Sequence, residues 1–164
     1  RHSDRPNTCM IEFQNVTKRY PESGEALSDV SFRIERGELA FLTGHSGAGK
    51  STLLRLIPAF ERPSRGDIIL DGVHVPKLNH RQIPHLRRKL GLIFQDYRLL
   101  TELILADEPT GNLDAELSEE IMRMFQDFNA VGVTVLIASH DQHLVQRFSQ
   151  RTLRLEHGRL AGDL

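Results

Sequence analysis

The glycine-rich stretch of residues 44–52 (GHSGAGKST) constrains this chain most, because it fits the phosphate-loop pattern G-x-x-x-x-G-K-[ST] at every fixed position. An apolar run, residues 39–43, precedes it, and a helix-like run, residues 50–57, follows it. The glycines are therefore expected at a strand-to-helix turn, where backbone N–H groups without partners can surround a phosphate. This local setting predicts a nucleotide-binding domain.

Length, charge and cysteine content limit the class of protein. The 164 residues, 39% of them hydrophobic, are enough for one soluble domain with a sizeable core. A net charge of −1, from 21 basic and 22 acidic residues, gives no electrostatic reason to expect nucleic acid as a partner. Cys9 is the only cysteine, which excludes an intramolecular disulfide and suits a reducing cytosol.

The ends and the hydropathy of the chain predict no membrane anchor of its own. No apolar run approaches the ~20 residues that span a bilayer, and the N-terminal segment lacks the layout of a signal peptide. Membrane association is therefore expected through a partner. Residues 1–9 are polar and without periodicity, which indicates a vector remnant or a loose extension before a domain of residues 10–164. A genuine N-terminal arm is the alternative.

Apolar periodicity and turn residues predict strands that alternate with helices. Strands are expected at residues 11–20, 27–34, 39–43, 67–70, 90–94, 103–106, 133–138 and 152–156, and helices at residues 50–57, 84–89, 115–129 and 142–148. Pro58 should end the first helix, and Asp71-Gly72 should form a hairpin turn that returns through Val73 and Val75. This order predicts a three-layer α/β domain with a mainly parallel sheet. The basic run of residues 87–89 is expected to be a solvated face.

One connection does not fit this scheme. Only residues 95–102 (QDYRLLTE) separate the apolar runs at 90–94 and 103–106. Parallel neighbours in a sheet need a crossover of about a dozen residues or more, and this segment has no hairpin signal either. Two interpretations stay open: a segment is missing here, or the two runs are not sheet neighbours.

The phosphate loop assigns roles to its own residues. Backbone amides of residues 46–51 should surround the phosphates, with the ammonium of Lys50 on the β- and γ-phosphates. The hydroxyl of Ser51 would ligate Mg²⁺, and Thr52 would contact the α-phosphate. The expected nucleotide-binding positions are Gly44, His45, Ser46, Gly47, Ala48, Gly49, Lys50, Ser51 and Thr52.

Two adjacent carboxylates, Asp107 and Glu108, follow the apolar run at 103–106. Asp107 would hold Mg²⁺ through its water shell, and Glu108 would deprotonate the attacking water as a general base. Because adjacent carboxylates repel one another, a bound cation would account for the pair. Together with the phosphate loop, they predict a nucleotide hydrolase.

The motifs resemble those of the nucleotide-binding subunit of an ABC transporter. Residues 44–52 are similar to the Walker A loop, residues 103–108 to the Walker B strand, and residues 111–114 (GNLD) to the D-loop. Gln95 resembles the Q-loop glutamine, which senses the γ-phosphate and Mg²⁺, and His140 the switch histidine. Tyr20 matches the aromatic residue that stacks on adenine. Taken alone, Tyr20 suits a core position and His140 a surface position, but their order along the chain favours the functional roles.

The resemblance, which covers residues 10–164, implies a P-loop NTPase core with an added N-terminal antiparallel β subdomain. It also implies ATP and Mg²⁺ as cofactors, and a homodimer that forms with ATP. A permease-like membrane subunit would dock near Gln95 at the cytoplasmic face of the inner membrane. The segment ADEPTGNLD (residues 106–114) is shared by the cell-division, lipoprotein-release and macrolide-efflux branches, and residues 94–100 (FQDYRLL) favour the first.

The chain departs from the family near residues 100–102. There the helical subdomain and its LSGGQ-like signature motif are absent, so the chain should bind nucleotide but hydrolyse it poorly. A disordered subdomain left out of the printed chain is the favoured explanation, and a genuine deletion is the other. Cα–Cα distances near ~3.8 Å at each step would indicate a true junction. A nucleotide-binding module without turnover is the rival function.

Overall fold

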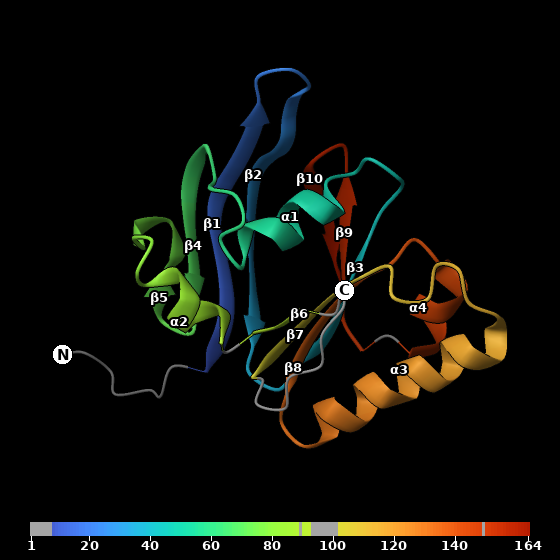
Figure 1. Cartoon of the computed structure of the whole chain (residues 1–164). Helices are drawn as coiled ribbons and strands as arrows, with labels where there is room; N and C mark the ends of the chain where they lie inside the picture. The colour runs from blue at the N-terminus through green and yellow to red at the C-terminus, as the bar shows by residue number, and fades with distance from the viewer. Residues whose placement is uncertain (1–7, 89, 93–101, 149) are drawn as a thin grey trace.

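Two β-sheets carry the fold in the computed structural model, which describes residues 8–88, 90–92, 102–148 and 150–164 (Figure 1). The first sheet is antiparallel, with the order β2-β1-β4-β5. Its strands are β1 (Cys9–Tyr20), β2 (Gly24–Glu35), β4 (Arg65–Leu70) and β5 (Val73–His74). This sheet confirms the expected N-terminal antiparallel subdomain.

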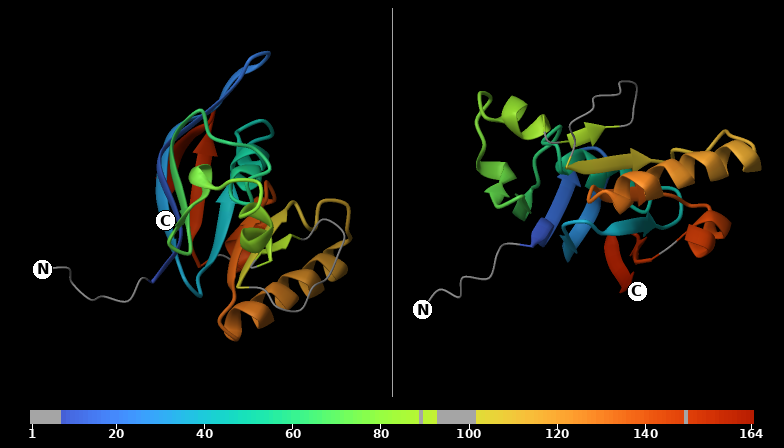
Figure 2. Two further views of the ribbon diagram at one scale, coloured as in Figure 1. Left: turned by 60° about the vertical axis from the view of Figure 1, so that its left-hand side comes forward. Right: turned by 90° about the horizontal axis from the view of Figure 1, so that it is seen from below.

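The β1–β2 hairpin forms because alternating apolar residues of both strands face the core. Phe13 pairs with Phe32, and the two rings stack with their centroids 4.6 Å apart. β1 begins at Cys9, two residues earlier than predicted, and Cys9 is buried against β2. The turn at the far end is exposed, and it extends beyond the rest of the domain in Figure 1 and in the left view of Figure 2.

The second sheet has six strands in the order β10-β9-β3-β8-β7-β6. All neighbours are parallel except β10, which pairs antiparallel with β9. The bounds are β3 (Leu39–Thr43), β6 (Leu90–Leu92), β7 (Leu103–Asp107), β8 (Thr134–Ala138), β9 (Thr152–Glu156) and β10 (Arg159–Asp163). The mainly parallel sheet is thus confirmed, and the strand at the phosphate loop has its predicted bounds.

The strands of the second sheet are apolar on both faces because both faces are covered. In β3, Leu39 and Phe41 pack with α3 (Ala115–Ala130) and α4 (Gln142–Phe148). Ala40 and Leu42 belong to the opposite cluster, which contains α1 (Lys50–Leu56) and the antiparallel sheet. Figure 1 shows the resulting layers, with α3 and α4 on one side of the parallel sheet.

Two short segments differ from expectation. Val75 does not extend β5 but opens the 3₁₀ helix η1 (Val75–Lys77), in which Pro76 is tolerated near the start. Arg87, at the end of α2 (Ile83–Arg87), is not part of a solvated face. Its guanidinium donates hydrogen bonds to the carbonyls of Pro58 and Ala59, just beyond α1, and lies over the ring of Phe60. A helix end leaves carbonyls without partners, so Arg87 supplies donors there.

β6 and β7 are hydrogen-bonded parallel neighbours, so the interpretation that these two runs are not adjacent is wrong. Leu90 pairs with Leu103, and Leu92 with Leu105. The crossover between them, residues 93–102, is shorter than the usual helical crossover of a dozen or more residues. Leu100 and Thr101, at the expected junction, lie outside the described residues.

An ion cluster ties the C-terminal hairpin to Glu38, immediately before β3, and gives a prediction about acid stability. Arg151 donates two hydrogen bonds to Asp163, of 3.0 and 2.9 Å, and one of 3.2 Å to Glu38. The hydrogen bond from Arg151 holds the pKa of Asp163 below its usual value. The folded state is therefore stabilised above the ordinary carboxyl pKa of about 3.9, and this contribution is lost as the pH falls below it.

We expect Asp163→Asn to lower the free energy of unfolding at pH 7 by about 1 kcal/mol or less, because the pair is partly exposed. The difference from the unsubstituted chain should shrink towards pH 3. Urea unfolding at both pH values measures it, with Asp127→Asn, on the exposed face of α3, as the control. An Asp163→Asn difference that is the same at both pH values would contradict this assignment.

Candidate functional site

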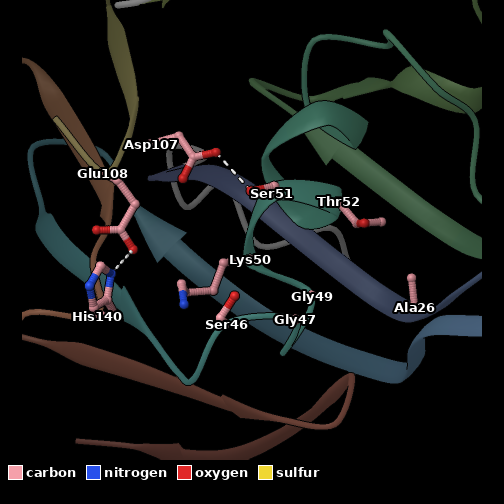
Figure 3. Close-up of a pocket in the computed structure, with 10 residues that line it drawn as sticks. All are labelled: Ala26, Ser46, Gly47, Gly49, Lys50, Ser51, Thr52, Asp107, Glu108 and His140. Carbon is pink, nitrogen blue, oxygen red and sulfur yellow. Dashed lines mark hydrogen bonds and ion pairs between the residues drawn. The ribbon is translucent and has the colours of Figure 1, made fainter. Parts of the chain in front are cut away.

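A cavity of about 410 Å³ lies at the carboxyl ends of β3, β7 and β8, where the phosphate loop and the carboxylates meet (Figure 3). Its lining consists of Ala26, Ser46, Gly47, Gly49, Lys50, Ser51, Thr52, Asp107, Glu108 and His140. All of these except Ala26 were predicted from the sequence. Parallel strands place their carboxyl ends at one edge of the sheet, which is why segments distant in the chain converge here.

Glycines at two loop positions permit close backbone approach. Gly44 has φ +154°, and a Cβ there would come within 2.6 Å of the carbonyl oxygen of Leu155. Gly49 precedes α1 with φ +108°, and its Cβ would meet the carbonyl oxygen of Ala26 at 2.7 Å. Both positions therefore require glycine, for backbone conformation as well as for space.

Lys50, which is expected to bind phosphate, is buried beside the phosphate loop. Its ammonium donates to the carbonyl oxygens of Gly44 and His45, the latter at 3.1 Å. These neutral acceptors satisfy the buried charge. Phosphate oxygens would accept from the same ammonium and carry the opposite charge, so they would attract it more strongly than the neutral carbonyls do.

Ser51 and Asp107, both predicted for the metal, are brought into direct contact. The hydroxyl of Ser51 donates a 2.8 Å hydrogen bond to the Asp107 carboxylate, which points towards it in Figure 3. Within the described residues, no group of three or more acidic, histidine or cysteine side chains is placed to hold a metal alone. Mg²⁺ bound with nucleotides takes one or two protein oxygens, and phosphates and waters complete its shell. Ser51 and Asp107 fit this chemistry.

Glu108 and His140 form the second pair in the cavity. Nδ1 of His140 lies 2.8 Å from Oε1 of Glu108. Glu108 has φ +47°, a left-handed conformation that is uncommon for a residue with a side chain. Its N–H donates to the carbonyl of Ala138 at 2.8 Å, and its own carbonyl accepts from the N–H of Gly111 at 3.2 Å. These bonds hold the turn that directs Glu108 to His140 while Asp107 faces Ser51 (Figure 3).

Tyr20 stands beside the cavity but is not among the residues that line it. Its hydroxyl donates to the carboxylate of Glu61 and also interacts with Thr52, which does line the cavity. Burial, and then the bond to Glu61, raise the pKa of Tyr20. The ammonium of Lys18 lies 5.1 Å from the ring centroid. The adenine-stacking role of Tyr20 stays a prediction.

The remaining predicted residues are not among those that line the cavity. Gln95 lies outside the described residues. The amide of Ala48 donates to the carbonyl of His45 at 3.1 Å, inside the loop. The ring of His45 lies 4.7 Å from that of His157, and neither residue lines this cavity. Sequence reasoning missed Ala26 and His157, since a strand alanine and a turn histidine carry no motif.

Comparison with known families agrees with the geometry. The family model described as "ABC transporter" matches residues 27–155, which is most of the chain. The match begins in β2 and ends in β9, so it contains the phosphate loop, both carboxylates and His140.

Several similar curated proteins are named as cell-division proteins. The cell division ATP-binding protein FtsE of Escherichia coli (strain K12) is 39% identical over 219 positions, covering 94% of this chain and 99% of that protein. FtsE of Mycobacterium tuberculosis is 34% identical, covering 94% of this chain and 95% of that protein. Because 219 aligned positions exceed the 164 residues of this chain, the E. coli protein has positions without a counterpart here.

Solved structures share the fold. A bacterial ABC transporter cassette solved as a dimer superposes with a TM-score of 0.86 at 25% identity, covering 94% of this chain and 98% of that chain. A dimeric cassette in a post-hydrolysis state, bound to ADP and phosphate, gives the same TM-score at 24% identity and the same coverage. The chain therefore belongs to the ABC transporter family, as an ATPase cassette that resembles the cell-division protein FtsE.

Proposed function

We propose that the chain is the ATP-binding and ATP-hydrolysing subunit of an FtsE-type membrane complex that acts in bacterial cell division. The observation that carries the proposal is the convergence of two pairs, Ser51 with Asp107 and Glu108 with His140, on one cavity beside the phosphate loop. One pair suits the metal of a bound nucleotide, and the other suits a water molecule at its terminal phosphate.

In this proposal the loop amides and Lys50 bind the phosphates, with Lys50 exchanging its carbonyl acceptors for phosphate oxygens. Ser51 would supply an oxygen ligand to Mg²⁺, and Asp107 would hold the ion through its water shell. When bound, Mg²⁺ would neutralise charge that develops on the phosphates. Gln95 is proposed to report on the γ-phosphate and the metal, and Tyr20 to contact the adenine.

Glu108 is the proposed general base. Its carboxylate would accept the proton of the attacking water, while His140, at 2.8 Å, orients that carboxylate and contacts the γ-phosphate. A base must reach the water it activates, and the left-handed turn at Glu108 directs the side chain away from the Ser51–Asp107 pair. Metal binding and water activation are thereby assigned to different carboxylates.

The proposed partner is an integral membrane subunit of the FtsX type, which would regulate cell-wall hydrolysis from the cytoplasmic face of the inner membrane. The names of the curated relatives support the cell-division role, and the dimeric neighbour supports assembly as a dimer. No helix in the part of the chain that the structure describes is long and apolar enough to cross a membrane. An exporter ATPase for lipoproteins or macrolides is the alternative, distinguished by which permease co-purifies.

A nucleotide-binding module without turnover is a second candidate. Two observations favour it: the short crossover between the parallel strands β6 and β7, and alignments with FtsE that are longer than this chain. We propose that a helical subdomain with the signature motif is missing at this crossover. Such a chain would hold ATP through its own loop but would lack the group that covers the ATP of a second subunit.

Ser51→Ala tests the proposed site directly. Titration calorimetry of the unsubstituted chain with ATP should give tighter binding with Mg²⁺ than with EDTA. In Ser51→Ala the advantage of Mg²⁺ should fall about tenfold, because the hydroxyl ligand is lost. Ser23→Ala, in the exposed turn between β1 and β2, makes the same chemical change away from the cavity and serves as the control. Equal binding with Mg²⁺ and EDTA in the unsubstituted chain would argue against the metal site, and phosphate release separates the two candidate functions.

A further inference from the structure

We infer that the turn between β9 and β10 positions the phosphate loop, and that the side chain of His45 contacts this turn and does not bind phosphate. The inference rests on the proposed nucleotide-binding function and adds positioning residues that no motif indicates. The turn contains His157 and Gly158, more than a hundred residues after the loop in the sequence. It contacts the loop at Ala48 and His45.

Backbone hydrogen bonds tie the turn to two segments of the site. The N–H of Gly158 donates to the carbonyl of Ala48, in the middle of the phosphate loop, at 2.9 Å. The carbonyl of Gly158 accepts from the N–H of Ser28, in β2, at 2.8 Å. Gly158 therefore bridges the loop to the strand that carries Ala26, a lining residue of the cavity.

His45 completes the contact through its ring. Its Nε2 accepts from the N–H of His157 at 3.4 Å, and its Nδ1 lies 2.8 Å from the carbonyl oxygen of Ser46. A carbonyl only accepts, so both contacts are satisfied together when the ring is neutral with its proton on Nδ1. The two imidazole rings also pack with centroids 4.7 Å apart. Both ring nitrogens of His45 therefore have partners within the protein, one of them in the turn.

Space explains why the turn carries glycine. Gly158 has φ +78°, and a Cβ there would lie 2.5 Å from the carbonyl oxygen of Ala26 and 3.2 Å from the Cα of Leu27. Backbone atoms cannot yield as the end of a flexible side chain does. Any side chain at this position would push the turn away from β2 and so withdraw the donor from Ala48.

The expected role is pre-organisation of the phosphate loop. A loop held in its binding conformation before the ligand arrives loses less conformational freedom on binding, which improves affinity without a new ligand contact. Loss of one of these hydrogen bonds should weaken nucleotide binding about fivefold to tenfold. A role confined to global stability would instead lower the melting temperature without a matching change in affinity.

Gly158→Ala and Gly37→Ala form a matched pair for the first test. Gly37 has φ +77°, almost the same conformation, but a Cβ there meets nothing within 4 Å. Both variants carry the conformational penalty, and only Gly158→Ala displaces the turn. We expect the Kd for Mg-ATP to rise about fivefold or more in Gly158→Ala and to change less than twofold in Gly37→Ala. Equal affinities in the two variants would overturn the inference.

His45→Phe and His45→Gln provide a second test, in which the residues of the turn itself are unchanged. Phe keeps the ring contact but removes the acceptor, whereas Gln offers a carbonyl oxygen near the position of Nε2. His45→Phe should therefore weaken Mg-ATP binding about fivefold, and His45→Gln should restore much of it. The exposed His80→Phe is the control. Unchanged affinity in His45→Phe would refute the role of the ring, whereas absent binding in the unsubstituted chain would refute the proposed function itself.

Discussion

Glu108→Gln is expected to lower phosphate release from ATP by about a hundredfold or more, the range in which a positioned general base contributes. Gln has the same size as Glu and can still interact with His140, but it does not accept a proton from water at neutral pH. Binding of Mg-ATP should change less than twofold, because Ser51, Asp107 and the loop are unaltered. The substitution therefore separates the chemical step from binding.

The measurement is a single-turnover assay with the chain in excess over ATP, so that slow hydrolysis remains readable. Glu102→Gln makes the same chemical change immediately before the opposite end of β7, where Glu102 is exposed, and serves as the matched control. Phosphate release in Glu108→Gln at the rate of the unsubstituted chain would show that another group is the base. The same assay on the complex with its membrane subunit extends the test to the assembled enzyme.

Lys50→Ala is expected to weaken Mg-ATP binding by about a hundredfold. The ammonium would make at least one charge-assisted hydrogen bond to phosphate, and such bonds contribute about 1.5–3 kcal/mol each. In the free chain its partners are the carbonyl oxygens of the half-buried Gly44 and the exposed His45, which water can bond after the substitution. The loss should therefore fall on the complex with ATP and much less on the fold.

Thermal unfolding with and without nucleotide tests whether the substitution affects ATP binding more than the stability of the fold. Saturating Mg-ATP should raise the melting temperature of the unsubstituted chain through binding to the folded state, and this rise should be absent in Lys50→Ala. Lys77→Ala, an exposed change in η1, should keep the full rise. An equal rise in Lys50→Ala would contradict the assignment of Lys50 to the phosphates.

Local signals in the sequence predicted the parts of the fold that depend on local physics. The phosphate loop, its strand β3 and helix α4 have their predicted bounds. Apolar periodicity, and glycines at the turns between elements, determine such bounds within a few residues. The side of the cavity that holds Ser51, Asp107, Glu108 and His140 was also predicted. Each of these residues lies within two positions of the start or the end of an element with a strong apolar pattern.

Contacts between segments that are distant in the chain could not be predicted from the sequence. Arg87 belongs to a basic run, and nothing in that run indicates that its guanidinium turns inward to the carbonyls after α1. The sequence around His157 and Gly158 predicts an ordinary hairpin turn, and nothing in it indicates that Gly158 donates a hydrogen bond to Ala48 of the phosphate loop. The adjacency of β6 and β7 was left open because the length of the crossover conflicts with the usual rule for parallel neighbours.

The position of β6 at the edge of the sheet bears on how the domain tolerates changes in length. Among the described strands, β6 pairs with β7 alone and ends the order of the second sheet. Lengthening or shortening that crossover acts mainly through loop-closure entropy, about 0.6 kcal/mol for each doubling of length. The register of β7 against β8, which places Asp107 opposite Ala138, is held by separate hydrogen bonds. A whole module can therefore be gained or lost at this edge over evolutionary time while Asp107 and Glu108 keep their places.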